Sequence, residues 1–432
     1  MTHGSPKISI GSQACATFAF RVVQALLEVL MTMLLARFLV SEEYGAWTVA
    51  WSCMMLVAIP AQFGLPQLIV RESSRGMSSG HFSVVKGLHR AACSVGAGIG
   101  FPVVGIAMLL VAWLRPPEDI PLFGIAMLSI PFVILSNLRQ AFMRGVRRPV
   151  SGQFSEYLVQ PVVRIALLLL LKMEQPDLTA QTAMLAVTGS WMISAMTGEI
   201  LRRWRQPKEL SGVTAVYRWC YWGKEALPFM MVGGLQAANQ RLDVLMLDIM
   251  GFGHQAGIYQ VSLTLTRLSN FFLTAVNAVM GTYLVDYMTR NDKAGMQTLL
   301  DKYYSRMFYC AAVFILSMML SSHWLLLGAY GKEYLQAQWP LIILLLGQTV
   351  NIACGCDMLL LNMAGYQKKS ARTVVYSLFI NLGCNVLFIP VLGILGAAIA
   401  TSASTISWNV ITVRDVRKYC GVNPVTVGVL FH

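Results

Sequence analysis

Twelve long runs of mostly apolar residues dominate this 432-residue chain, and each is long enough to cross a lipid bilayer as a helix. Hydrophobic residues make up 56% of the chain and charged residues only 12%, whereas a soluble protein carries about 25% charged residues. A soluble fold of this size has too little interior to hide so many apolar side chains. We therefore predict an all-α membrane protein with twelve transmembrane helices, at residues 13–39, 44–63, 86–114, 120–143, 150–171, 179–201, 221–247, 256–285, 303–328, 336–363, 371–391 and 394–413.

The positions of lysine and arginine predict how the chain is oriented in the membrane. If both termini lie on one side, 24 of the 33 basic residues fall on that side, four fall on the other side and five lie within the spans. Cytoplasmic loops carry the excess of basic residues in membrane proteins, so both termini are expected in the cytoplasm. The net charge of +13 then reflects topology and gives no reason to expect nucleic-acid binding. The first apolar run is too long for a signal peptide and is expected to be a transmembrane helix.

The chain divides into two similar halves. Residues 202–220 form a long connection without a predicted span near the middle of the chain, and six spans lie on each side of it. Short similarities recur between the halves, as between Phe142-Met143-Arg144-Gly145 and Asn362-Met363-Ala364-Gly365. An even number of spans in each half makes the two repeats parallel. Two six-helix lobes, residues 1–210 and 211–432, around a central cavity are typical of a transporter.

Polar and charged side chains share one face of several predicted spans. A charge at the bilayer centre costs roughly 2.5–3.5 kcal/mol, so it is expected to face a cavity or a partner. Arginine grips phosphate through two parallel hydrogen bonds and stays charged at any relevant pH. One interpretation is a water-filled vestibule for an anionic substrate, with the candidate substrate-binding residues Arg21, Glu28, Arg164, Gln240, Arg241, Arg267 and Asn270.

The same side chains also have a structural interpretation. Polar residues commonly hydrogen-bond between packed membrane helices, and Arg21–Glu28 and Arg241–Asp243 are candidate structural ion pairs. Arg139, the fifth arginine within the spans, has the same two interpretations. Both are open at the level of sequence.

Asp243 has a further possible role as the carrier of a coupling ion. Burial raises the pKa of an acid, whereas a nearby cation lowers it, so an acid within a span is suited to carrying a proton. Sodium prefers carboxylate and carbonyl oxygens. The candidate ion-coupling residues are therefore Asp243, Asn381, Asn385 and Thr401.

Motifs for enzymatic chemistry do not stand out in this sequence. The nine cysteines are scattered through apolar runs, which is neither a disulfide framework nor a zinc pattern. The sequence has no recognisable nucleophile–base pair and no nucleotide-binding glycine loop. We expect a protein that is not an enzyme and that has no cofactor apart from a coupling proton or sodium ion.

Six short segments together resemble one family. The chain is similar to the Wzx-type oligosaccharide flippases of the multidrug/oligosaccharidyl-lipid/polysaccharide export superfamily. The resemblance covers nearly the whole chain and rests on the combination of Ala36-Arg37-Phe38-Leu39-Val40-Ser41-Glu42-Glu43-Tyr44-Gly45, Gly64-Leu65-Pro66-Gln67-Leu68-Ile69-Val70-Arg71-Glu72, Asn239-Gln240-Arg241-Leu242-Asp243, Gly257-Ile258-Tyr259, Asn277-Ala278-Val279-Met280 and Leu361-Asn362-Met363-Ala364-Gly365. Val40 and Ser41 stand where the family has Gly-Pro, and Asn385 stands at a position where a carboxylate occurs in relatives.

The resemblance implies a function in O-antigen, lipopolysaccharide or exopolysaccharide synthesis in the bacterial inner membrane. The implied activity moves an undecaprenyl-diphosphate-linked oligosaccharide from the cytoplasmic to the periplasmic leaflet by alternating access. Arg21, Arg241 and Arg267 would meet the diphosphate or acidic sugars, and Asp243 would belong to the ion site. The implied partners are the lipid-linked glycan, the bilayer, and a polysaccharide polymerase with its chain-length protein; a monomer is expected.

Two other functions fit a membrane protein of this size. A multidrug or cation antiporter of the same fold would need an apolar, aromatic and acidic cavity, which five intramembrane arginines disfavour. A polysaccharide polymerase or ligase would need a large periplasmic loop, whereas the predicted outer connections are all short.

Overall fold

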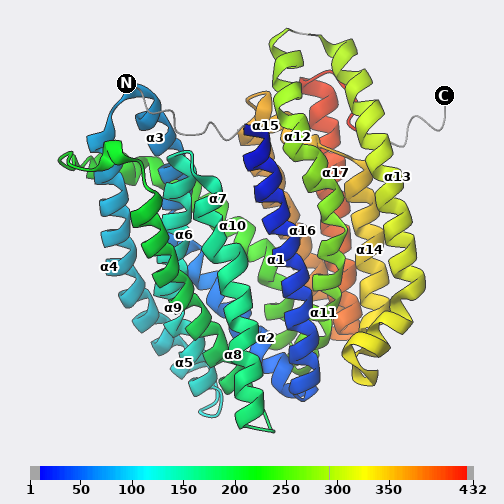
Figure 1. Cartoon of the computed structure of the whole chain (residues 1–432). Helices are drawn as coiled ribbons and strands as arrows, with labels where there is room; N and C mark the ends of the chain where they lie inside the picture. The colour runs from blue at the N-terminus through cyan, green and yellow to red at the C-terminus, as the bar shows by residue number, and fades with distance from the viewer. Residues whose placement is uncertain (1–9, 291, 426–432) are drawn as a thin grey trace. The chain divides into compact units, whose positions relative to one another are not determined.

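The computed structural model describes residues 10–290 and 292–425, and within these ranges the chain forms helices and no β-strand (Figure 1). The predicted all-α class is confirmed. The α-helices are α1 (Ile10–Phe38), α2 (Ser41–Ala58), α3 (Leu65–Ser79), α4 (Phe82–Leu114), α5 (Ile120–Leu128), α6 (Ile130–Gly145), α7 (Pro149–Phe154), α8 (Gln160–Glu174), α9 (Ala180–Arg205), α10 (Trp219–Ile249), α11 (Ala256–Leu268), α12 (Asn270–Thr289), α13 (Lys293–Leu325), α14 (Gln338–Ala353), α15 (Asp357–Met363), α16 (Gln367–Leu392) and α17 (Ile394–Tyr419).

Each of the twelve predicted spans coincides with one helix or with two successive helices. Among the described residues, nine segments are long and apolar enough to cross a membrane, and the bent pair within residues 332–363 adds a tenth. The remaining two predicted spans are α10 and the α11–α12 pair. Charged side chains such as Arg241, Asp243 and Arg267 lie in these helices and lower their hydropathy.

The helix α3 lies between the second and third spans, in a segment where no element was predicted. Leu65, Leu68 and Ile69 are buried, whereas Arg71 is exposed, which is the pattern of an amphipathic helix on a protein surface. The helix begins after Gly64, whose φ of 65° lies in the left-handed region that favours glycine. It packs on α4 and α6.

The chain folds into two compact units. Unit 1 consists of Met1–Leu39 and Ala50–Ala237, and unit 2 consists of Val40–Val49 and Ala238–His432. These boundaries fall within α2 and α10, whereas the predicted lobes divide at residues 210 and 211. The start of α2 belongs to unit 2 because Tyr44 is fully buried there against Gly257 of α11.

Helix packing within each unit follows from small residues and tight turns. In unit 1, α3, α4 and α9 all pack on α6. In unit 2, α16 and α17 form an antiparallel hairpin that also contacts α14. Gly393 makes the turn with a φ of 56°, and Gly396 lies so close to the Phe388 carbonyl that a Cβ would approach its oxygen to 2.4 Å. The short turn places residues equally distant from Gly393 opposite each other on the two helices.

The contact between α2 and the turn that leads into α11 gives a first testable prediction. A Cβ on Gly45 would lie 2.6 Å from the Gly253 carbonyl oxygen, so Gly45→Ala must push two backbones apart. We expect it to destabilise the protein by about 1–3 kcal/mol, as overpacked cores do, and to lower the melting temperature of the purified protein. The control is Gly383→Ala in α16, where a Cβ meets no atom within 4 Å. Equal melting temperatures for the two variants would contradict the close packing.

Candidate functional site

A buried carboxylate, Asp243 in α10, lies at the centre of a polar cluster in unit 2. Its side chain is 4% exposed, and four uncharged side chains of the described residues donate hydrogen bonds to it. Asn381 and Asn385 donate to Oδ1 at 3.0 and 2.8 Å, and the hydroxyl of Tyr259 donates to Oδ2 at 3.2 Å. Thr401 also donates to Oδ2. The cluster therefore joins α10 to α11, α16 and α17.

The α16–α17 hairpin positions three of these donors. Asn381 and Asn385 are one turn apart on α16, so their amides share one face of the helix. Thr401 lies as far after the Gly393 turn as Asn385 lies before it, so the hairpin brings the two side chains to the same level. All four predicted ion-coupling residues, Asp243, Asn381, Asn385 and Thr401, thus meet in one place.

The cluster is rich in oxygen atoms that suit a small hard cation. Asn385 donates to Asn381 Oδ1 at 2.9 Å, and its own Oδ1 is buried without a hydrogen-bond partner in the structure. A half turn of both amides about their last side-chain bond would point two amide oxygens at the space beside the carboxylate. Together with Thr401 and Tyr259, these groups offer carboxylate, amide and hydroxyl oxygens, which are the ligands that hard cations prefer.

Tyr259 is a member of the cluster that the sequence did not indicate. Its ring is fully buried, and its hydroxyl lies 3.0 Å from Thr401 Oγ1 as well as against Asp243. No spacing rule connects it to Asp243, because the two residues are on different helices. The only sequence signal for Tyr259 is the motif Gly257-Ile258-Tyr259. Gly257 in this motif packs against Tyr44 of α2.

In unit 1, Glu28 of α1 and Arg164 of α8 form an ion pair. Arg164 Nη2 lies 2.6 Å from Glu28 Oε1. The Arg164 side chain is 2% exposed, whereas that of Glu28 is 39% exposed. The guanidinium also lies 5.7 Å from the centre of the Trp51 ring. Two of the predicted substrate-binding residues therefore meet, and the charge of Arg164 is compensated within the unit.

The other predicted substrate-binding residues differ in how much of their surface is exposed. Arg21 is exposed on α1 in unit 1. In unit 2, Gln240 and Arg267 are exposed and Arg241 is partly buried. Asn270 is partly buried and accepts a hydrogen bond from Asn351 at 3.3 Å, so its side chain links α12 to α14. Their role in binding stays a prediction.

Solved structures with a similar arrangement of helices include two transporters of the MOP superfamily and a lipid II flippase. An inward-facing multidrug resistance transporter of the MATE family is 12% identical, with a TM-score of 0.76 over 94% of this chain and 97% of the other. The lipid II flippase MurJ in an inward closed conformation is 14% identical, with a TM-score of 0.68 over 96% and 90%. A transporter of the MOP superfamily from Pyrococcus furiosus is 12% identical, with a TM-score of 0.67 over 96% of both chains. This similarity establishes the fold, so the predicted twelve-helix, two-lobe architecture is confirmed.

Sequence comparisons identify the family. The probable low-salt glycan biosynthesis flippase Agl15 of Haloferax volcanii is 25% identical over 166 residues, which are 38% of this chain and 34% of that protein. The match thus spans about a third of the length of that relative. A family model described as "Polysaccharide biosynthesis protein" matches residues 11–280, which is more than half of the chain. This protein therefore belongs to the polysaccharide biosynthesis protein family, as a multi-pass membrane protein with the fold of the MOP superfamily.

Proposed function

We propose that this protein is a flippase that moves an undecaprenyl-diphosphate-linked glycan repeat unit from the cytoplasmic to the periplasmic leaflet. Membership of the polysaccharide biosynthesis family supports a glycan substrate. The names of two similar proteins, a probable glycan biosynthesis flippase and the lipid II flippase MurJ, support transport of a lipid-linked glycan. The protein acts as a transporter and not as an enzyme.

The observation that carries the proposal is the Asp243 cluster. A carboxylate that is buried within a membrane span among uncharged donors costs free energy. Such a residue is expected to be kept because the function requires it. We assign Asp243, Asn381, Asn385, Thr401 and Tyr259 to a site for one coupling cation, a proton or a sodium ion. Binding and release of that cation would change the charge that holds four helices together, which gives the ion gradient a means of driving alternating access.

Arginine side chains would contact the anionic part of the substrate. Arg21 and Arg267 are exposed and Arg241 is partly buried, so part of each side chain is accessible to a substrate. Gln240 and Asn270 would hydrogen-bond to the glycan. Glu28 and Arg164 compensate each other, and we assign that pair to orienting α1 against α8 beside the substrate. The polyprenyl tail would stay in lipid.

The location of the protein follows from the proposed substrate. Undecaprenyl diphosphate belongs to the bacterial inner membrane, and the asymmetry of basic residues favours cytoplasmic termini. The O-antigen, lipopolysaccharide or exopolysaccharide pathway would then supply the cargo. A polymerase and a chain-length protein would use it on the periplasmic side, with the flippase acting as a monomer.

Deleting the gene tests this proposal. We expect a complete undecaprenyl-linked repeat unit to accumulate on the cytoplasmic face, where added glycosidases reach it only after the membrane is opened. Arg241→Ala should reproduce this accumulation with a normal amount of folded protein in the membrane. Arg306→Ala, which removes an exposed charge elsewhere in unit 2, should restore export. An unchanged glycan together with altered drug sensitivity would instead indicate the multidrug antiporter.

A further inference from the structure

A cavity of about 790 Å³ lies within unit 1, away from all the residues assigned to transport above. Its walls come from α4, α6, α9 and the segment that follows α9, at the end of the unit where α4 begins and α9 ends. The asymmetry of lysine and arginine predicts that this end faces the cytoplasm. Its volume falls in the range of sites for small molecules and headgroups.

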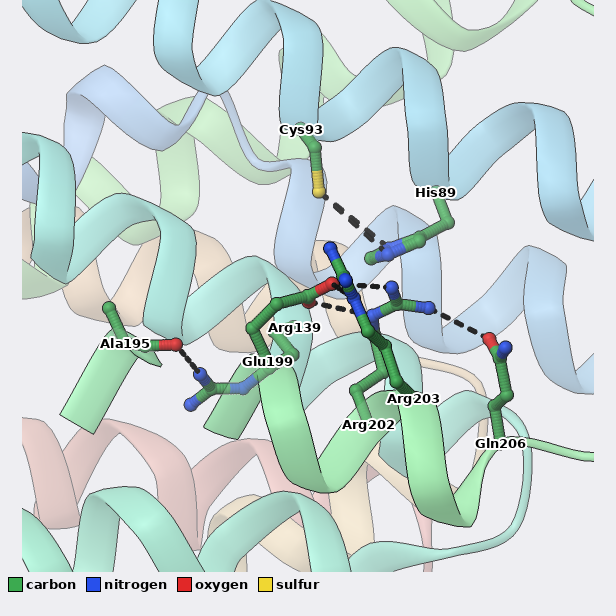
Figure 2. Close-up of polar contacts among 8 residues, drawn as sticks. All are labelled: His89, Cys93, Arg139, Ala195, Glu199, Arg202, Arg203 and Gln206. Atoms are coloured by element: carbon green, nitrogen blue, oxygen red, sulfur yellow. Dashed lines mark hydrogen bonds and ion pairs between the residues drawn. The ribbon is translucent and has the colours of Figure 1, made fainter. Parts of the chain in front are cut away.

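The cavity is basic. Its lining includes Lys86, Arg90, Arg139 and Arg202 but only one acid, Glu199. Figure 2 shows that Glu199 is already engaged by two arginines of its own helix. Arg202 binds it through Nε and Nη2 at 2.8 and 2.6 Å, and Arg203 donates to it at 3.0 Å. The acid is thus neutralised locally, and the lining keeps an excess of positive charge.

Arg139 is held at the wall of this cavity by α9. Its Nη1 donates to the carbonyl oxygen of Ala195 at 2.8 Å (Figure 2). Nη1 also donates to the Ser194 carbonyl oxygen at 3.1 Å, and Nη2 donates to Ser155 Oγ at 2.8 Å. These acceptors are all uncharged. Gly198 makes room for the guanidinium, because a Cβ there would lie 1.8 Å from Arg139 Cζ. A cation that is 4% exposed therefore lies beside the cavity with uncharged hydrogen-bond partners, while the buried carboxylate of Glu156 interacts with its charge from nearby.

The segment after α9 closes one side of the cavity. Lys86 Nζ donates to the Val213 carbonyl oxygen at 2.9 Å, and the Val216 amide donates to the Ser83 carbonyl oxygen at 3.1 Å. Gly87 lets this segment approach α4, since a Cβ there would lie 1.9 Å from the Val216 carbonyl oxygen. On another side His89 stacks on Phe142, with ring centres 4.1 Å apart, and provides a flat aromatic wall.

We infer that this cavity binds a phosphate group, carried either by the headgroup of an anionic membrane lipid or by a free phosphate compound. Arginine and lysine that converge on one space are the groups that bind phosphate in proteins. Basic pockets between helices on the cytoplasmic side also bind anionic lipid headgroups. Membrane orientation alone does not explain Arg139, because a basic residue that only sets topology lies in a solvated loop and does not need burial within a span.

This inference does not depend on the proposed transport activity and is tested by binding. The full chain, purified in detergent, is titrated with inorganic phosphate, with short-chain phosphatidylglycerol, and with the short-chain diacylglycerol that lacks phosphate. Native mass spectrometry counts the bound molecules, and the shift in melting temperature reports affinity. The variants are Arg90→Gln, Arg90→Glu and the double variant Lys86→Gln with Arg90→Gln. The matched control is Arg205→Gln with Lys208→Gln, two exposed basic residues nearby that do not line the cavity.

We expect phosphatidylglycerol to bind and the double variant to weaken that binding about tenfold or more, the loss expected for a charge-assisted contact. Arg90→Glu should weaken it more than Arg90→Gln, and the control should bind normally. If inorganic phosphate binds as tightly as phosphatidylglycerol, the result supports a phosphate site whose ligand is a free phosphate compound. Equal binding of diacylglycerol, or equal losses in the variants and the control, would overturn the inference. The exposed position of Arg90 keeps its variants informative even if the double variant folds poorly.

Discussion

Asp243→Asn will stop transport while leaving the fold intact. Asparagine has the shape of aspartate and still offers one oxygen to the donors on α16 and α17, but it carries no charge. A unit charge contributes about 4 kcal/mol to a cation 4 Å away at an effective dielectric constant of 20. The affinity for the coupling cation should therefore fall by about 1,000-fold. Complementation of the deletion strain measures the effect as accumulation of the lipid-linked repeat unit.

The melting temperature distinguishes a specific loss of transport in Asp243→Asn from a loss of folded protein. Replacing Asp243 by asparagine leaves no charged donor without its partner, because the side chains that donate hydrogen bonds to Asp243 are uncharged. The melting temperature of Asp243→Asn should therefore equal or exceed that of the natural protein. Asp286→Asn is the matched control, since it removes an exposed carboxylate whose ion pair with Arg290 contributes little. Full export by Asp243→Asn would refute a coupling role for this carboxylate.

Glu28→Ala will destabilise unit 1 more than removal of its arginine partner does. The substitution leaves Arg164 charged and 2% exposed without its carboxylate. Breaking a buried ion pair costs about 3–5 kcal/mol, and the partial exposure of Glu28 reduces the expected loss to about 2–3 kcal/mol. Arg164→Met should cost less, because it leaves a carboxylate that water can reach. Melting temperatures of the purified variants, with the yield of folded protein in membranes, check this order.

A double variant distinguishes the ion pair from simple loss of packing. Glu28→Gln with Arg164→Met removes both charges and keeps most of the side-chain volume. It should be more stable than Glu28→Ala alone, and a double-mutant cycle should show an interaction energy of about 1 kcal/mol or more. Strictly additive losses would show that the two charges do not stabilise each other.

Some elements were easy to predict because lipid imposes strict requirements on a chain. A backbone in the bilayer core must satisfy its own hydrogen bonds, so each long apolar run has to be helical. The helix α3 was not predicted, because the search relied on long apolar runs. It is short and amphipathic and packs on α4 and α6, so its apolar residues do not form a run that hydropathy detects.

The candidate site was predicted in part, and particular residues show why. Asn381 and Asn385 share a helix face, which the spacing of one turn already indicates. Glu28 illustrates the limit of this reasoning. Spacing placed it on one face of α1 with Arg21, two turns apart, whereas its ion pair is with Arg164 on α8. A periodicity identifies the face of a helix but not the neighbour that covers it.

The sequence by itself determined that this chain is a helical membrane protein with twelve spans, because burial in lipid depends on local composition and on the length of each run. It also placed ionisable residues within the spans. Only the tertiary structure decided which of these residues meet. Tyr259 joins Asp243 and its three predicted partners, and Glu28 of α1 pairs with Arg164 of α8. Contacts between helices depend on close packing at residues such as Gly198, Gly257 and Gly396, whose effect appears only when the neighbouring helix is in place.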